Sequence, residues 1–275
     1  MPPLFLFLTG SWCYDSLICG KKNRPDTWSS QGHCNGKRQS PIDIVTSSVR
    51  HNPKLGAVTL TGYNDTKKLL EMKNTGKTVD IELGEGLQLS GPGLPATYTA
   101  KAFHLHWGDG VHKPGSEHYI NGERYSMELH IVHTKNNTSV SEALKDPQGI
   151  AVLAFFVQVR DWGGEGFVEQ RCKQLTSPCT GEETKFDGSF SLQDLLGRPE
   201  LDRYYRYPGS LTTPGCDEVV LWTIFADPIL VSEDVVSAAI LCVCVCVGRR
   251  SSCLKHLRYT REIWEIGFSL GSPCN

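Results

Sequence analysis

Two short runs of the sequence place three histidines in segments that read as β-strands. FHLHW at residues 103–107 contains His104 and His106, and His130 follows in a second apolar run, two residues after Glu128. Side chains alternate between the faces of a strand, so His104 and His106 point the same way, and Glu128 shares a face with His130. The pattern favours a fold that brings three imidazoles together. A single histidine in an apolar strand is more often a core residue hydrogen-bonded to its neighbours.

Three imidazoles that converge from two strands predict a metal site of catalytic type. Three protein ligands leave the fourth position of a tetrahedral zinc ion open, and this distinguishes catalytic from structural zinc sites. Metal-bound imidazoles usually donate their second N–H to an outer acceptor, and Glu128 is placed to accept from His130. This carboxylate strengthens the metal interpretation relative to that of three core histidines.

The composition bounds the class of protein. With 275 residues, 39% of them hydrophobic and 21% charged, the chain is long enough for a sizeable core and typical of an ordinary globular protein. The formal net charge of −2 gives neither the basic footprint of a nucleic-acid-binding protein nor a strong field toward membrane surfaces. We therefore expect no nucleic-acid partner, and the sequence indicates no oligomeric state.

Strand-like runs bounded by turn residues dominate the chain. We expect strands at 57–61, 78–83, 86–90, 102–107, 125–133 and 150–159. Helical signals are short, at 139–144 and 191–196. Asn121-Gly122 predicts a hairpin between residues 118–120 and the strand that starts at Tyr125. No internal repeat or interdomain linker is visible, so the sequence predicts a single, mainly β domain with a few short helices.

Cysteines and glycosylation sequons point to the secretory route. The chain has 11 cysteines without a C-x-x-C pair, which argues against a zinc ribbon or a thioredoxin-type motif. Sequons at Asn64, Asn136 and Asn137 permit N-glycosylation. Residues 1–10 are similar to a partial signal segment, with no basic start and a short apolar run. We expect an extracellular or cell-surface protein with an incomplete signal segment.

The last part of the chain differs in character from the rest. An apolar run at 235–247 contains three alternating cysteines and is followed by Arg249 and Arg250. The run is too short to span a bilayer as a helix, but the basic pair leaves membrane association open. We favour a buried or edge strand that leads into a divergent tail.

Longer motifs around the histidines carry a resemblance to a known family. They are QSPI at 39–42, GSEH at 115–118 and YPGSLTTP at 207–214. Together with the histidines, they make the region from about Trp12 to Ala238 similar to α-class carbonic anhydrases. WCY at 12–14 and the positions of Cys34 and Cys216 resemble most the extracellular, often membrane-anchored vertebrate members. We thus expect a partial signal segment at 1–10, a carbonic anhydrase-like domain at 11–239 and a divergent cysteine-containing tail at 240–275.

The resemblance implies both a fold and a reaction. The fold is a single domain around a twisted, mostly antiparallel ten-stranded sheet. The reaction is the zinc-dependent, reversible hydration of carbon dioxide to bicarbonate and a proton through a zinc-bound hydroxide. The implied zinc ligands are His104, His106 and His130. Glu117 and Thr212 match the pair that orients the hydroxide.

Further residues match the family's substrate site and disulfide. Thr213 matches a residue beside the substrate, and the apolar wall where carbon dioxide docks is matched by Leu211, Val132, Val152 and Trp222. Cys34 and Cys216 match a disulfide that would tether the N-terminal segment beside the Thr212 loop. Cys13 with Cys19 is a candidate second bridge, and Cys172 with Cys179 a third that rests on spacing alone.

Three departures from the family affect the expected activity. Lys77 occupies the position that usually holds the proton-shuttle histidine, and an ordinary lysine releases a proton poorly near neutral pH, so we expect slower proton transfer. Ala102 stands two residues before His104, where active members commonly carry a glutamine that accepts the His104 N–H. The family's C-terminal segment, which supplies a backbone acceptor to the second zinc histidine, is not recognisable after about Ala239.

Two other functions compete with a zinc lyase. One is a noncatalytic carbonic anhydrase-like binding domain, against which the intact set of three histidines argues. The other is a truncated product that does not fold. Zinc content, hydration of carbon dioxide and inhibition by a sulfonamide distinguish the three possibilities.

Overall fold

The computed structural model describes residue 14 and residues 25–108, 113–159 and 183–233. Within these ranges the chain is mainly β, with a few short helices, as the sequence predicts. The segments 1–10 and 240–275 and the apolar run at 235–247 lie outside the described residues. Of the helices that are described, none has the length and hydropathy needed to cross a membrane.

The strands and helices follow one another along the chain as short elements. The strands are β1 (Asp43–Ile44), β2 (Thr59–Thr61), β3 (Leu69–Asn74), β4 (Val79–Leu83), β5 (Gln88–Ser90), β6 (Tyr98–Trp107), β7 (Tyr119–Ile120), β8 (Met127–Lys135), β9 (Ile150–Val159), β10 (Glu183–Lys185), β11 (Tyr204–Gly209) and β12 (Val220–Val231). The α-helices are α1 (Val140–Ala143) and α3 (Leu192–Leu196), and 3₁₀ turns lie at Pro25–Ser30, Thr46–Ser48 and Thr66–Lys68. Ser139 and Ser191 cap the two α-helices through their side chains.

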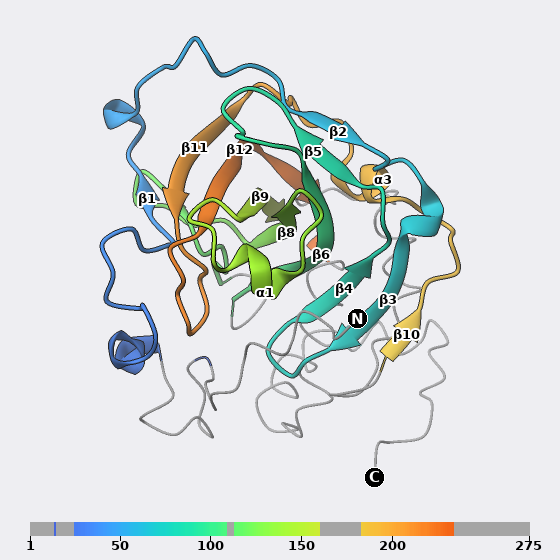
Figure 1. Ribbon diagram of the computed structural model, residues 1–275, viewed down its shortest axis with the longest axis horizontal. Helices are drawn as coiled ribbons and strands as arrows, with labels where there is room; N and C mark the ends of the chain where they lie inside the picture. The colour runs from blue at the N-terminus through green and yellow to red at the C-terminus, as the bar shows by residue number, and fades with distance from the viewer. Residues whose placement is uncertain (1–13, 15–24, 109–112, 160–182, 234–275) are drawn as a thin grey trace.

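Ten of these strands form one large mixed sheet. Its order is β10-β3-β4-β6-β8-β9-β12-β11, while β5 pairs with β6 and β2 with β5. Neighbours run antiparallel except β9 and β12, which are parallel. Figure 1 shows β6, β8, β9 and β12 side by side in the middle of the molecule. The expectation of a mostly antiparallel ten-stranded sheet is confirmed.

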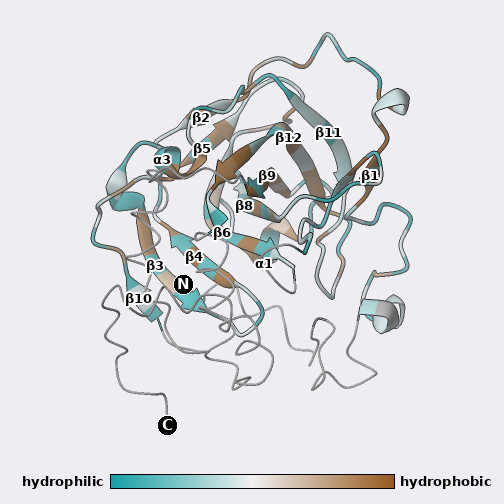
Figure 2. Ribbon diagram, turned by 180° about the vertical axis from the view of Figure 1, so that it is seen from behind, coloured by the Kyte–Doolittle hydropathy of each residue, from teal (hydrophilic) through white to brown (hydrophobic). Residues whose placement is uncertain are grey.

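Side-chain alternation along the central strands divides the core into two clusters. Leu129 and Ile131 of β8 belong to one cluster, whereas Val132 belongs to the other. Glu128 and His130 share the face of Val132, because side chains two residues apart point the same way. Hydrophobic colour follows the strands of the sheet, including β5, β9 and β12, in Figure 2. The histidines therefore project from a sheet that is rigidly packed on its opposite face.

The predicted elements differ from the observed ones mainly in their partners and bounds. Strand β9 has the expected bounds, β6 begins earlier than expected, at Tyr98, and β3, β11 and β12 were not predicted. Asn121 and Gly122 form the expected tight turn, both with positive φ, closed by a bridge between Ile120 and Glu123. However, the strand before this turn, β7, pairs in parallel with β1 and not with the strand near Tyr125. Local turn chemistry sets the reversal, while the strand partner depends on the distant chain.

Candidate metal centre

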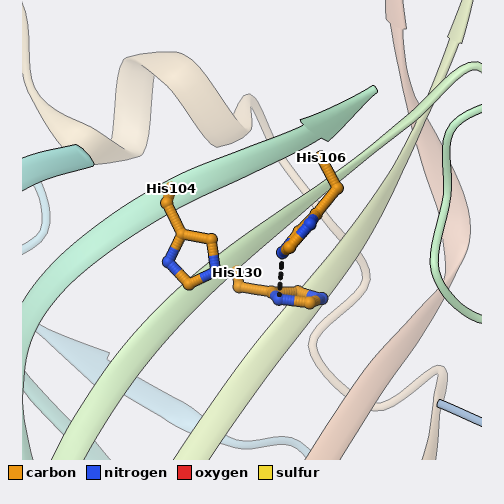
Figure 3. Close-up of side chains that lie close together, drawn as sticks. All are labelled: His104, His106 and His130. Carbon is orange, nitrogen blue, oxygen red and sulfur yellow. Dashed lines mark hydrogen bonds between the residues drawn. The ribbon is translucent and has the colours of Figure 1, made fainter. Parts of the chain in front are cut away.

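The structure brings the three predicted histidines together on one face of the sheet. His104 on β6 lies directly opposite His130 on β8, and His106 lies opposite Glu128. One ring nitrogen from each histidine falls within 4.8 Å of the others, a group that could hold a metal ion. His106 Nε2 lies 3.1 Å from His130 Nδ1. Figure 3 shows nitrogens of all three rings turned toward a common point.

These histidines are held in the form that binds metals. Burial, with a further contribution from His130, lowers the pKa of His104 to about 3. Burial and the neighbouring imidazoles hold the pKa of His106 well below its ordinary value, and burial lowers the pKa of His130. All three rings are therefore neutral at physiological pH, and a neutral imidazole offers one lone pair. The donor set fits zinc, since three imidazole nitrogens leave the fourth position of a tetrahedral ion open.

A carboxylate stands behind the ring of each histidine. Glu128 Oε1 lies 2.6 Å from His130 Nε2. Glu117 Oε1 lies 3.3 Å from His106 Nδ1, and Asp80 Oδ1 lies 4.0 Å from His104 Nδ1. Only the first of these distances is a hydrogen bond. Side-chain alternation along β8 predicts the Glu128 contact. The other two contacts were not predicted, because each joins residues that are not neighbours in one strand.

Glu128 belongs to a buried network that extends to the far side of the site. It accepts from the His118 backbone N–H at 2.8 Å, and Glu128 Oε1 lies 2.7 Å from His118 Nδ1. His118 Nε2 and Ser40 Oγ each lie 2.7 Å from the Tyr207 hydroxyl. Burial by itself raises the pKa of Glu128, but His118 and His130 outweigh it and hold that pKa well below its ordinary value. The carboxylate is thus ionised and fixed in place.

His118, Tyr207 and Ser40, which extend this network beyond Glu128, were not predicted, although the sequence carried a signal for them. His118, Tyr207 and Ser40 all lie inside the motifs GSEH, YPGSLTTP and QSPI. When a motif includes residues besides the catalytic one, the residue types at those other positions are also constrained by the fold or the site. The sequence does not say which of those neighbours contact one another.

Glu117 and Thr212, the pair that is expected to orient the hydroxide, lie together. The side chain of Thr212 hydrogen-bonds Glu117. Burial, reinforced by the charge of Glu128, raises the pKa of Glu117 to about 8 although this hydrogen bond lowers it. Glu117 Oε2 is buried and has no hydrogen-bond partner among the described residues. An orphaned buried carboxylate oxygen is costly, and a bound cation nearby would favour its ionised form.

The predicted apolar wall is a single cluster beside the histidines. Val132, Val152 and Trp222 are buried in one hydrophobic cluster, and the half-buried Leu211 packs against it. The Trp222 ring packs edge-on at 4.9 Å from His130, and its N–H donates to the Ser210 carbonyl. The wall therefore adjoins the candidate metal ligands.

The remaining predicted positions of the site are Thr213, Lys77 and Ala102. Thr213 is half-buried and its carbonyl accepts from the backbone of Cys216. Lys77 lies in the turn between β3 and β4, where burial lowers its pKa. Ala102 is buried, pairs with Val132 and offers His104 no side-chain acceptor.

The expected disulfide between Cys34 and Cys216 is confirmed. It joins residues 182 apart in sequence. Near it, the His33 N–H donates to the Gly215 carbonyl, and Arg38 contacts Glu218. The bridge therefore fastens the N-terminal segment to the loop that carries Thr212. The other candidate bridges, Cys13 with Cys19 and Cys172 with Cys179, fall in ranges that the structure does not describe.

Several known proteins with sequences similar to this chain are carbonic anhydrases. The model of the eukaryotic-type carbonic anhydrase family matches residues 23–256. Carbonic anhydrase 4 of Rattus norvegicus is 41% identical over 230 residues, which cover 81% of this chain and 72% of that protein. Carbonic anhydrase 6 of Bos taurus is 36% identical over 84% of this chain and 73% of its own length. Carbonic anhydrase 15 of Mus musculus is 36% identical over 80% of this chain and 70% of its own length.

The match to the family model includes the whole candidate centre, from Ser40 to Trp222. The family uses zinc and hydrates carbon dioxide, and the three-histidine group of this chain is able to hold a metal ion. The chain therefore belongs to the eukaryotic-type carbonic anhydrase family of enzymes.

Proposed function

We propose that this chain hydrates carbon dioxide reversibly at a zinc ion held by His104, His106 and His130. The observation that carries the proposal is the convergence of three neutral imidazoles, two of them buried and that of His104 half-buried, beside the Glu117–Thr212 pair. A bound zinc ion would supply a Lewis acid that brings the pKa of water from 15.7 to about 7, as it does in carbonic anhydrases.

Glu117 and Thr212 would select and orient the oxygen nucleophile. When Glu117 is ionised it can only accept, so the Thr212 hydroxyl must donate its hydrogen to that carboxylate. The Thr212 oxygen is then left as an acceptor. It admits a nucleophile that carries a hydrogen and turns the lone pair of that nucleophile toward the carbon atom.

The apolar wall would hold carbon dioxide without competing hydrogen bonds. Carbon dioxide has neither charge nor donor, and Val132, Val152 and Trp222 present apolar surface next to His130. Leu211 completes this surface, and Thr213 lies beside it on the same loop as Thr212. Bicarbonate is charged and gains nothing from such a surface, which favours its release.

Proton release would be slow in this chain. Lys77 has a pKa below the ordinary lysine value because of burial, but near neutral pH an amine still tends to keep its proton. A general acid or base works best when its pKa lies near the operating pH. We therefore infer a hydration rate that is limited by proton transfer to buffer.

The decisive experiment combines zinc content with hydration measured by stopped flow. We expect about one zinc per chain and sulfonamide-sensitive hydration, with both lost in His106→Ala and retained in His51→Ala, which changes an exposed histidine. Zinc without hydration would favour a noncatalytic binding domain. Aggregated, zinc-free protein would indicate a truncated product that does not fold. Either outcome contradicts the proposal.

We also infer an extracellular or cell-surface location and N-glycosylation. The Cys34–Cys216 disulfide favours an oxidising compartment, and the sequon residues Asn64, Asn136 and Asn137 are exposed. In secretory expression, removal of N-glycans should lower the mass of the wild type, and Asn64→Gln with Asn136→Gln and Asn137→Gln should abolish that shift. Asn52→Gln, at an exposed asparagine outside any sequon, is the control. Assay of medium and membrane fractions distinguishes a secreted from a membrane-held protein.

A further inference from the structure

Asp80 is a buried carboxylate that faces the least supported histidine of the centre. It lies on β4 directly opposite His104 on β6, so the two side chains share a face of the sheet. Asp80 Oδ1 is 4.0 Å from His104 Nδ1, and the two side chains are 8% and 19% exposed. This distance exceeds a hydrogen bond by about 1 Å, within reach of a side-chain rotation or a bridging water.

Nothing else in the described part of the chain holds the outer nitrogen of His104. No side-chain hydrogen bond of this ring is seen there, and Asp80 is its one carboxylate within ion-pair distance. Ala102, on the same face and two residues earlier, ends in a methyl group. Figure 3 shows one His104 nitrogen turned toward His130 and the other turned away. A metal ion on the inner nitrogen would leave the hydrogen on Nδ1, which faces Asp80.

The other two histidines show the arrangement that His104 lacks. Glu128 Oε1 is 2.6 Å from His130 Nε2, and Glu117 Oε1 is 3.3 Å from His106 Nδ1. A carboxylate behind a metal-bound histidine fixes the ring and increases its basicity as a ligand. The same residue type therefore stands behind all three rings, at increasing distance.

We propose that Asp80 is a positioning residue that accepts the outer N–H of metal-bound His104 and replaces the acceptor that Ala102 does not supply. The acceptor comes from the neighbouring strand instead of from the histidine's own strand, and the β4–β6 register makes this exchange possible. The inference rests on the proposed zinc site and assigns one more residue to its support.

The direct test is zinc affinity, measured by competition with a chromophoric chelator. In Asp80→Ala we expect zinc to bind roughly 10–100-fold more weakly, the usual loss for an outer-shell partner. Asp80→Asn keeps an oxygen acceptor of the same shape, so its loss should be smaller. Glu82→Ala is the matched control: this exposed carboxylate lies two residues along the same strand, opposite Ala102, and its removal should leave the zinc affinity unchanged.

A rescue variant separates the loss of an acceptor from general damage. Ala102→Gln places an amide acceptor on the histidine's own strand, so in the Asp80→Ala background it should recover most of the lost zinc affinity. Unfolding of the zinc-free proteins supplies the second readout. Loss of an acceptor should lower the zinc affinity but leave the stability of the apo-protein nearly unchanged. If Ala102→Gln does not fold, the comparison of Asp80→Asn with Asp80→Ala still decides.

The possible failures are distinguishable. If the wild type binds no zinc, the proposed function fails. If the wild type binds zinc and Asp80→Ala binds it equally well or more tightly, the role of Asp80 is overturned. The role of Asp80 is also overturned if Asp80→Asn and Asp80→Ala lose the same zinc affinity and the same apo-protein stability.

Discussion

At the residue scale, the proposed function depends most on the position of one hydrogen atom, between Thr212 and Glu117. Thr212 can orient a nucleophile only while its hydrogen is given to Glu117, and the two side chains are hydrogen-bonded. Burial raises the pKa of Glu117 to about 8, so this carboxylate needs a nearby cation to stay ionised at neutral pH. In the proposed mechanism, metal binding and the orientation of the nucleophile are therefore coupled through the charge of Glu117.

Removal of the Thr212 hydroxyl should affect turnover without affecting the metal. We expect Thr212→Ala to lower kcat/KM for hydration by roughly 100-fold, because the nucleophile loses its orientation. Zinc content should stay at the wild-type level. Thr59→Ala, which removes an exposed hydroxyl on β2, should leave both quantities unchanged. A loss of zinc in Thr212→Ala would instead assign this residue to support of the metal.

Lys77 should give the enzyme a distinctive pH and buffer dependence. Burial lowers the pKa of Lys77 below the ordinary lysine value, but an amine is a poorer proton shuttle near pH 7 than an imidazole. In weak buffer, kcat should therefore rise as the pH increases above neutrality, and imidazole-type buffers should raise it at pH 7. Lys77→His should increase kcat in weak buffer by about tenfold or more and level off near pH 7. Failure of imidazole to accelerate the zinc-loaded wild type would contradict this account.

At the scale of single elements, the two faces of β8 have different roles: one contributes to the candidate centre and the other to the core. Glu128, His130 and Val132 face the candidate centre, whereas His133 points into the opposite core. Its Nε2 lies 2.5 Å from the Tyr63 hydroxyl, and its Nδ1 lies 3.2 Å from the Ala151 carbonyl. Both ring nitrogens are thus partnered, so this histidine is the structural kind that the sequence pattern alone does not distinguish from a ligand.

The buried His133 should make stability depend on pH. Burial lowers the pKa of His133 to about 4, below its value in the unfolded chain, so between pH 6.5 and 4 the unfolded state binds more protons. Stability is then lost as the pH falls, by up to about 3 kcal/mol of unfolding free energy. Urea unfolding of wild type and His133→Gln should show a smaller decrease in the variant. Equal decreases would contradict a buried neutral imidazole.

At the scale of the whole molecule, one covalent link joins distant parts of the chain. The Cys34–Cys216 bridge closes a loop between residues 182 apart and fastens the N-terminal segment to the Thr212 loop. The parallel pair of β9 and β12 and the pairing of β1 with β7 are likewise long-range. The loop of Thr212 and the strand β12 are therefore held by contacts with segments far away in the sequence.

Loss of this disulfide should destabilise the protein more than it affects the metal. We expect Cys34→Ser with Cys216→Ser to lower the free energy of unfolding by about 2–5 kcal/mol, because the unfolded chain regains conformational freedom. Zinc affinity should change little, since the ligands lie on β6 and β8 and not on the bridged loop. Urea unfolding and chelator competition measure the two effects. A large loss of zinc affinity with little change in stability would reverse this assignment.

The local sequence pattern was sufficient to predict features that depend only on residues close together in the chain. The period of two along β6 and β8 predicted that His104 and His106 share a face and that Glu128 supports His130, and both are observed. The bounds of β9 and the Asn121-Gly122 turn also follow from neighbouring residues alone. In each case the relevant atoms are separated by a few residues, so propensity and alternation determine their geometry.

The contacts between distant segments were decided by tertiary structure. Strand register brings these residues together, and nothing in the sequence near either residue indicates its partner. Asp80 meets His104 through the β4–β6 register, and β7 takes β1 as its partner although its turn predicted another strand. The network from Glu128 through His118 to Tyr207 likewise spans three separate motifs. The sequence by itself determined the family and the three histidines that are candidate metal ligands. Only the folded sheet determined which carboxylates stand behind them, since a cross-strand contact depends on how two distant segments align.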